Sequence, residues 1–164
     1  MTKTLLIVWH SMTGGARQLA QAAAEGAARE DGVSVVLKPA RETGPDDLLA
    51  ADAYMFVCPE NLAAIAGVMK DFFDRCYYPA LGRIDARPYV TLVCAGTDGE
   101  SAVRQIARIA TGWRLKPAAD PRIVLTRADT PEAILAPKVI GPEELEACRD
   151  MGHALAAGLQ MGIV

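Results

Sequence analysis

Short apolar runs of strand length alternate five times with stretches of helical periodicity, and this alternation constrains the fold more than any other feature of the sequence. The predicted strands are Thr4–Trp9, Val33–Lys38, Ala53–Cys58, Tyr89–Cys94 and Arg122–Thr126. The predicted helices are Ala16–Asp31, Pro45–Ala51, Ile65–Tyr78, Glu100–Thr111 and Pro142–Met161. Continuous apolar strands favour a parallel sheet with both faces covered. The alternation therefore predicts an α/β three-layer sandwich with right-handed crossovers and the strand order 2-1-3-4-5.

The length and composition fit one domain. The chain has 164 residues, of which 51% are hydrophobic, so it can bury a core without disulfides or metals. No linker or internal repeat divides it, and residues 1–164 are predicted to form a single domain. The segments Lys116–Pro121 and Arg127–Gly141 are rich in proline and are expected to be loops.

Charge and cysteine content exclude several classes of protein. A net charge of −3 indicates neither nucleic acid nor an anionic membrane as a partner. The apolar stretch near the N-terminus is too short for a secretory signal or a membrane insertion segment. The four cysteines have no spacing suited to a metal, and Cys58 and Cys94 are expected to be buried thiols. Reduced thiols without a signal peptide predict a cytoplasmic protein.

Three polar or glycine-rich loops follow the first, third and fourth predicted strands. In an open parallel sheet, ligands bind at the carboxyl ends of the strands, beside the point where the strand order reverses. The loops therefore converge on one crevice. They are His10–Ala16, Pro59–Ala64 and Gly96–Ser101.

The first of these loops has the composition of a phosphate site. It places hydroxyls and two glycines at the start of a helix, where free N–H groups and the helix dipole attract anions. It matches neither GxxxxGK[ST] nor GxGxxG. Because Ser and Thr are also good N-cap residues, a plain helix cap remains the alternative.

The segments HSMTGGARQLA, CPENLAAIAGVMKDFFDR and VTLVCAGTDGE together resemble the flavodoxin-like superfamily, and more closely its NAD(P)H-dependent FMN reductase and quinone reductase branch. The resemblance loosely covers the whole chain. It implies a flavodoxin-like fold, a bound FMN, NAD(P)H as electron donor, and electron transfer to a quinone or similar small-molecule acceptor. In such a flavoprotein the flavin carries the chemistry, and no catalytic side chain or metal is implied.

The resemblance also assigns roles to individual residues. The residues implied for the FMN phosphate are Ser11, Met12, Thr13, Gly14, Gly15 and Ala16. Those implied beside the isoalloxazine ring are Pro59, Glu60, Asn61 and Leu62. Those implied along the rest of the ring and the ribityl chain are Ala95, Gly96, Thr97, Asp98 and Gly99.

The chain departs from the flavodoxin pattern at two places. Ala16 stands where flavodoxins often carry a third hydroxyl, and neither ring loop contains an aromatic side chain. An open ring face favours an oxidoreductase that admits a nicotinamide or a quinone. Glu60 is expected to lower the flavin's reduction potential if its charge faces the ring.

Two other functions stay open beside the oxidoreductase. One is a flavodoxin-type electron carrier without its own substrate site, and the other is a non-catalytic module that uses the same fold to bind a partner. Tyr77-Tyr78-Pro79, at the end of the third predicted helix, lies in a region that often contributes to dimer or substrate surfaces in this superfamily, so a homodimer or homotetramer is one expectation.

Overall fold

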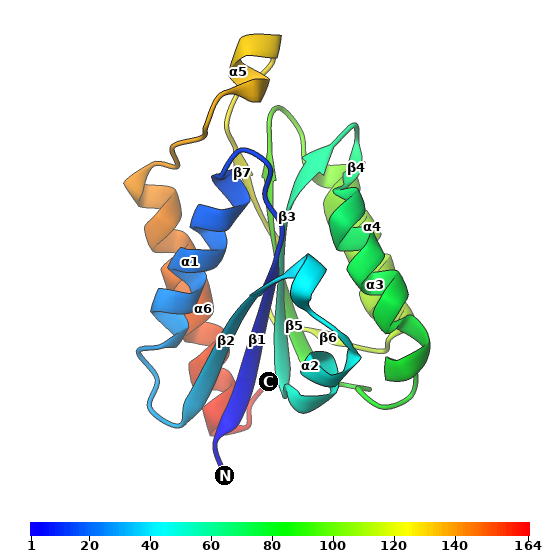
Figure 1. Cartoon of the computed structure of the whole chain (residues 1–164). Coiled ribbons are helices and arrows are strands. Elements are labelled where there is room, and N and C mark those ends of the chain that lie inside the picture. The colour runs from blue at the N-terminus through cyan, green and yellow to red at the C-terminus, as the bar shows by residue number, and fades with distance from the viewer.

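A computed structural model describes all 164 residues as a central sheet between two helical layers (Figure 1). The strands are β1 (Lys3–Trp9), β2 (Val33–Pro39), β3 (Ala53–Asn61), β4 (Ala64–Ile65), β5 (Pro88–Ala95), β6 (Lys116–Pro117) and β7 (Arg122–Leu125). The α-helices are α1 (Gly15–Ala27), α2 (Pro45–Ala50), α3 (Gly67–Ala80), α4 (Glu100–Gly112), α5 (Pro131–Leu135) and α6 (Pro142–Met161), and a 3-10 turn spans Ala40–Glu42.

The predicted topology is confirmed. The main strands run in the order β2-β1-β3-β5, and both β6 and β7 pair in parallel with the remaining edge of β5. These two short strands share the fifth position of the sheet, where the sequence analysis predicted the single strand Arg122–Thr126. Prolines lie within this interrupted edge, at Pro117 and Pro121, where a missing N–H is tolerated.

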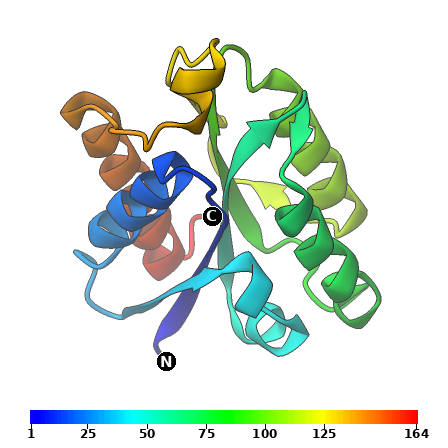
Figure 2. The same ribbon diagram turned by 45° about the horizontal axis from the view of Figure 1, so that its top comes forward.

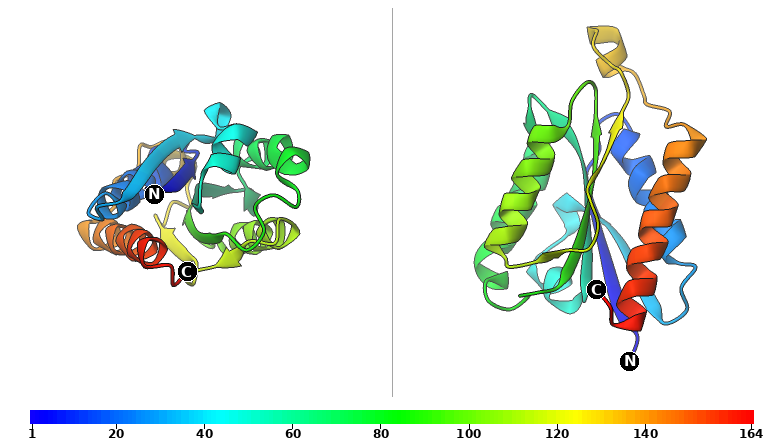
Figure 3. Two further views of the ribbon diagram at one scale, coloured as in Figure 1. Left: turned by 90° about the horizontal axis from the view of Figure 1, so that it is seen from below. Right: turned by 180° about the vertical axis from the view of Figure 1, so that it is seen from behind.

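Alternate residues of each central strand pack on opposite faces of the sheet. Leu5, Ile7 and their counterparts on β3 and β5 pack under α1 and α6. Leu6 and Val8 lie in the other core, under α2, α3 and α4. Figure 3 shows the sheet edge-on between these two layers. Burial of both faces explains why the strands read as uninterrupted apolar runs.

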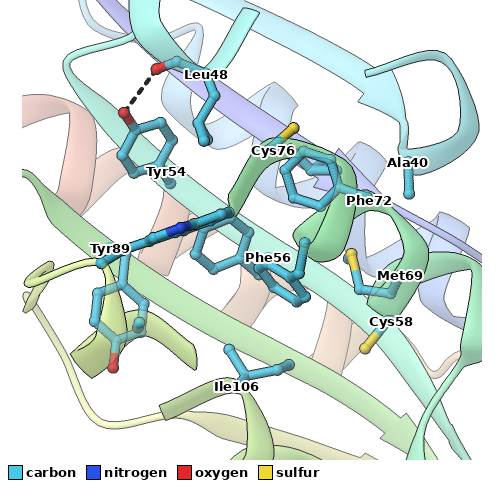
Figure 4. Packing of buried hydrophobic residues seen from close by; sticks show 14 of the residues in the cluster. Ala40, Leu48, Tyr54, Phe56, Cys58, Met69, Phe72, Cys76, Tyr89 and Ile106 are labelled. Atoms are coloured by element: carbon cyan, nitrogen blue, oxygen red, sulfur yellow. Dashed lines mark hydrogen bonds between the residues drawn. The ribbon is translucent and has the colours of Figure 1, made fainter. Parts of the chain in front are cut away.

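The core under α3 and α4 is rich in aromatic rings (Figure 4). Phe56 lies 5.1 Å from Phe73 in an edge-on arrangement and 5.9 Å from Tyr54 in a stacked one. The Tyr54 hydroxyl donates to the Leu48 carbonyl at 2.7 Å, so its one polar atom is satisfied. Trp113 is 1% exposed and packs against Phe73 at 5.5 Å.

The other core depends on close contact between helices. A Cβ atom on Gly26 would stand 1.9 Å from the Arg149 carbonyl oxygen, and one on Gly152 would stand 2.0 Å from that of Ala23. Only glycine fits at these two positions, which let α1 and α6 approach backbone to backbone. This contact fixes the position of α1, whose N-terminus faces the candidate site.

Several boundaries differ from the prediction. The first helix ends at Ala27, because the chain turns there through bonds from Arg29 and Glu30 to the carbonyls of Gly26 and Ala27. The segment 116–121 includes the two-residue strand β6, and the segment 127–141 includes the helix α5. The third predicted helix begins at Gly67, because Ile65 belongs to β4.

Candidate functional site

The N-terminus of α1 lies where β1 ends, at the carboxyl edge of the sheet. Gly14 takes the left-handed conformation there, with φ 95° and ψ −10°, and its N–H donates to the Ser11 hydroxyl at 3.0 Å. The N–H groups of Gly15, Ala16 and Arg17 have no acceptor within the protein. The first turn of a helix leaves such donors free, and they carry its positive dipole end. This end of α1 is open to an anion.

The N-terminus of α4 has nearly the same backbone geometry. Gly99 precedes it with φ 95° and ψ −17°. Its donors, however, are occupied by the Glu60 carboxylate, which accepts from the N–H of Gly99 at 2.9 Å and from that of Ala102 at 3.0 Å. Asp98 accepts from the Glu100 N–H at 3.3 Å. The protein's own acids therefore close this helix end.

The loop after β3 is a tight hairpin that brings Glu60 to α4. Glu60 pairs with Ile65 across the hairpin, and Asn61 pairs with Ala64. Leu62 and Ala63 form the two-residue turn at positive φ, 52° and 59°. Such turns usually contain Asn or Gly, and other residues there are strained. The strain is retained at the edge of the cleft, where the Leu62 side chain is fully exposed.

The expectation for Glu60 depended on its charge facing the ring, whereas the structure directs its carboxylate to the N-terminus of α4. Its two oxygens are bound by backbone donors at the positive end of α4, which offset its charge. Any influence of Glu60 on the potential of a bound redox group is reduced accordingly.

A fourth wall, formed by residues 126–138, was missed by the sequence analysis. This segment carries α5 and projects above the carboxyl ends of the strands (Figure 2). The Lys138 N–H donates to the Thr13 carbonyl at 2.8 Å. Gln18 reinforces the contact, because its Nε2 donates to the Lys138 carbonyl at 2.7 Å and its Oε1 accepts from the Ile140 N–H at 3.1 Å. The wall is therefore bonded directly to the first loop.

One signal in the sequence could have revealed α5. Thr130 and Pro131 are an N-cap followed by a proline in the first turn, a pair typical of helix starts. The Thr130 hydroxyl accepts from the Ala133 N–H at 3.2 Å. Proximity of this helix to the site depends on tertiary contacts and has no local signal.

These four segments enclose a cleft of about 500 Å³, a volume typical of sites for small molecules and cofactors. Twelve of the residues predicted for the site line it: Ser11, Met12, Thr13, Gly15, Ala16, Pro59, Glu60, Asn61, Leu62, Ala95, Gly96 and Thr97. Gly14 lines an adjoining smaller cavity, whereas Asp98 and Gly99 line neither. The lining residues that were not predicted are Ala63, Cys94, Thr126, Ala128, Ile134, Leu135 and Lys138.

Two glycines let the walls close on one another. A Cβ on Gly15 would stand 2.6 Å from the Cys94 sulfur, and one on Gly96 would stand 2.6 Å from the Ala128 carbonyl oxygen. Both glycines are therefore needed to bring the first and third loops against their neighbours.

Apart from the positive N-terminal end of α1, the cleft carries little uncompensated charge. Its charged lining residues are Glu60 and Lys138, and the Lys138 ammonium donates to the carbonyls of Ala133, Ile134 and Ala136 at 2.6–2.9 Å. Burial raises the pKa of the Cys94 thiol to about 11, so it stays protonated at neutral pH. No histidine lines the cleft, and no side chain in it is activated as a nucleophile. The arrangement can bind and orient a ligand whose own chemistry does the work.

Comparison with solved structures decides the fold family. A flavodoxin from the domain Archaea superposes with a TM-score of 0.77, covering 96% of this chain and 99% of the other at 16% identity. The flavodoxin, WrbA-like protein from Agrobacterium tumefaciens gives 0.72 over 97% and 98%, at 19% identity. The chain has the flavodoxin-like fold.

Two curated relatives extend the likeness to sequence. A flavodoxin from Aquifex aeolicus is 29% identical, and the match covers 93% of this chain and 84% of the relative. An NAD(P)H dehydrogenase (quinone) from Acidithiobacillus ferrooxidans is 30% identical over 91 residues, which cover 43% of this chain and 46% of that protein. Comparison with protein-family models gave no match.

The four cysteines are free and buried, as expected for Cys58 and Cys94. None of the helices combines the length and the apolar character that crossing a membrane requires.

Proposed function

We propose that this protein binds FMN and passes electrons from NAD(P)H through the flavin to a quinone or a similar small acceptor. The observation that carries the proposal is the open N-terminus of α1. Its unpaired N–H groups face a cleft of about 500 Å³ in the flavodoxin-like fold, whereas the matching end of α4 is closed by Glu60.

The residues present fit a flavin mononucleotide. The phosphate would accept from the N–H groups of Thr13, Gly15 and Ala16 and from the hydroxyls of Ser11 and Thr13, while the Gly14 N–H is held by Ser11. Ala16 supplies no third hydroxyl, which removes one hydrogen bond of about 1.5–3 kcal/mol from the phosphate. The ring would lie between the β3–β4 hairpin and the β5–α4 loop, among Pro59, Asn61, Thr97 and their neighbours.

When bound, the flavin would accept a hydride from NAD(P)H and donate electrons onward. The chain's residues would hold the phosphate, orient the ring and leave one ring face accessible. Exposed apolar side chains surround the mouth of the cleft: Met12, Leu62, Ile134 and Leu135. A flat, weakly polar acceptor such as a quinone fits this rim, and the likeness to a quinone dehydrogenase over part of the chain supports it.

A one-electron carrier of the flavodoxin type is the second candidate. The likeness to a flavodoxin over 93% of this chain supports it. A carrier that docks on basic proteins needs acidic groups around its flavin. The one carboxylate that lines this cleft, Glu60, is bound to α4. The lining of the cleft therefore favours the oxidoreductase, whereas the exposed acids Asp98, Asp129 and Glu132 on the surrounding segments are the groups that a carrier would use.

Steady-state assays of the FMN-loaded protein separate these functions. We expect NADH or NADPH to bleach the flavin spectrum, and an added water-soluble quinone to restore it with continued turnover. FMN binding without reduction by either nucleotide would identify a carrier. Absence of FMN binding would favour a non-catalytic module.

The remaining expectations stand as parts of this proposal. Free, buried thiols suit the reducing cytoplasm. Tyr77 and Tyr78 are exposed at the end of α3, so a homodimer or homotetramer built on this surface remains a prediction. Size-exclusion chromatography with light scattering would measure the oligomeric state.

A further inference from the structure

The fourth wall of the cleft, residues 126–138, is bonded to the rest of the protein at its two ends. At the first end, the Arg127 N–H donates to the Gly96 carbonyl of the β5–α4 loop at 2.9 Å. At the second end, the Lys138 N–H donates to the Thr13 carbonyl of the first loop at 2.8 Å. The wall therefore extends the β5–α4 loop, which borders the proposed ring site, and reaches from there to the loop proposed for the phosphate.

Between these ends the wall bonds only to itself. No hydrogen bond joins residues 128–137 to another part of the chain. The Lys138 ammonium instead donates to three carbonyls at the C-terminal end of α5, which satisfies acceptors that the end of a helix leaves free. No residue of α5 is buried, so this helix keeps its form without packing into the core.

The helix α5 presents two large apolar side chains to the cleft. Ile134 and Leu135 line it and are 53% and 77% exposed. The β3–β4 hairpin lines the same cleft with Leu62, which is fully exposed. Figure 2 shows α5 and the hairpin standing apart above the carboxyl ends of the strands. A flat apolar ring between these two elements would remove side chains of both from water, which favours binding.

Gln18 holds the second end of the wall in place. Its Nε2 donates to the Lys138 carbonyl at 2.7 Å and to the Gly14 carbonyl at 3.0 Å. Its Oε1 accepts from the Ile140 N–H at 3.1 Å. One amide thus joins the start of α1 to a segment 120 residues later in the chain. Gln18 does not line the cleft, so its effect on a ligand passes through the wall or through the first loop.

We propose that the fourth wall covers the ring of the bound flavin, with Ile134 and Leu135 in contact with the ring and Gln18 as the residue that positions them. This assignment rests on the proposed function, because it requires a flavin in the main cleft. It deepens that function by giving the ring contact to a segment outside the three loops predicted from the sequence. Neither the hairpin nor the β5–α4 loop carries an aromatic side chain, so aliphatic groups are the apolar surface that the ring would meet.

The first test compares FMN with riboflavin, which is FMN without its phosphate, by isothermal titration calorimetry of the flavin-free protein. Leu135→Ala should weaken the binding of both ligands by the same factor, about tenfold, because it removes apolar contact with the ring that they share. The matched control is Val139→Ala, which should change neither dissociation constant, because Val139 is 91% exposed and lines a different cavity. Leu135 is itself mostly exposed, so its truncation should leave the free energy of unfolding nearly unchanged in urea denaturation.

The second test is a double-mutant cycle between Gln18 and Leu135. Gln18→Ala should weaken FMN binding by about tenfold, because the wall loses the bonds that hold its second end. If Gln18 acts by positioning Leu135, the variant with both substitutions should bind FMN within about threefold of either single variant. An additive loss of about 100-fold would show that Gln18 acts through the first loop, and would overturn its positioning role.

Three results would overturn the ring contact while leaving the proposed function intact. One is unchanged binding of both ligands in Leu135→Ala. The second is a loss confined to FMN, which would show that this substitution acts on the phosphate. The third is binding of FMN by the unaltered protein without measurable binding of riboflavin, which would leave the phosphate as the main contact. Failure of the unaltered protein to bind FMN would overturn the proposed function together with the ring contact.

Discussion

The N-termini of α1 and α4 face the same cleft and have nearly identical backbone conformations, but the N-terminus of α1 is open and that of α4 is closed by a carboxylate. Each follows a glycine at φ 95°, at the end of a central strand. At α4 the Glu60 carboxylate, 39 residues earlier in the chain, accepts two backbone N–H bonds. At α1 the Gly14 N–H donates to the Ser11 hydroxyl, but the N–H groups of Gly15, Ala16 and Arg17 have no acceptor, and Arg17 adds a positive charge.

This difference shows how one fold can close one helix N-terminus and leave an equivalent one open. A helix end closed by an internal carboxylate has a structural role. Here the carboxylate hydrogen-bonds the β3–β4 hairpin to the β5–α4 loop and the start of α4. A helix end left open in a cleft is available to a ligand anion, because its donors would otherwise be paired only with water. The comparison can be tested by closing the open end or by opening the closed one.

The largest effect is expected from closing the α1 site with Gly14→Val. A β-branched residue is strained at φ 95°, so the loop should shift and its N–H groups should no longer converge. Losing one or two charge-assisted bonds of about 1.5–3 kcal/mol each should weaken FMN binding by about 100-fold. Fluorescence titration measures the dissociation constant.

Gly82→Val is the matched control for backbone strain. Gly82 also has positive φ, 72°, and no atom lies within 4 Å of the place its Cβ would take. It follows α3, outside both cavities. This variant should lose about 1–2 kcal/mol of stability and keep its FMN affinity. An unchanged affinity in Gly14→Val would move the phosphate site away from α1.

Opening the α4 site with Glu60→Ala should have the next largest effect. Removal of the carboxylate leaves the Gly99 and Ala102 N–H groups without their acceptor, which should lower the free energy of unfolding by about 2 kcal/mol. Urea denaturation measures this loss. Glu100→Ala, which removes an acidic side chain from the same helix turn, should cost about 0.3–1 kcal/mol.

The same variant provides a second test of the comparison. With its donors freed, the end of α4 should bind an anion, as we propose for α1. Sulfate should therefore raise the urea midpoint of unfolding more for Glu60→Ala than for Glu100→Ala, when both variants are measured at equal ionic strength. Equal sulfate responses would show that the end of α4 is not an anion site even when open.

The strands and the first loop could be predicted because their signals are local. An uninterrupted apolar run such as Leu5–Val8 indicates a strand buried on both faces. The predicted order of strands is the common one for a doubly wound sheet of five strands. The cluster of Ser11, Thr13 and two glycines indicated a helix start, which the structure confirms with free N–H groups, while phosphate binding there stays a prediction.

The role of Glu60 could not be predicted, because its partners are set by tertiary structure. Nothing near Glu60 in sequence indicates that it accepts from α4. The hairpin was also missed, since Leu62 and Ala63 lack the Asn-Gly signature of a two-residue turn. The first helix was predicted to reach Asp31, but it ends at Ala27, and the positive φ of Gly32 serves the turn into β2.

The smallest expected effect concerns His10, whose side chain adds a titratable group to the α1 loop. Burial, and to a lesser extent the charge of Arg41, hold the pKa of His10 below its ordinary value of 6.5. Between that lowered pKa and pH 6.5, the unfolded chain binds a proton at His10 that the folded chain resists. The stability of the folded protein should therefore decrease as the pH falls through this window.

Arg41→Gln removes the second cause, so the pKa of His10 should rise slightly and this decrease should become shallower. NMR titration of the imidazole signals measures the change directly, with Arg83→Gln, an exposed substitution after α3, as the control. If Arg41→Gln left the titration of His10 unchanged, the shift would be assigned to burial alone. Arg17 would then remain the charged side chain that distinguishes the α1 end from the α4 end, with no contribution from Arg41.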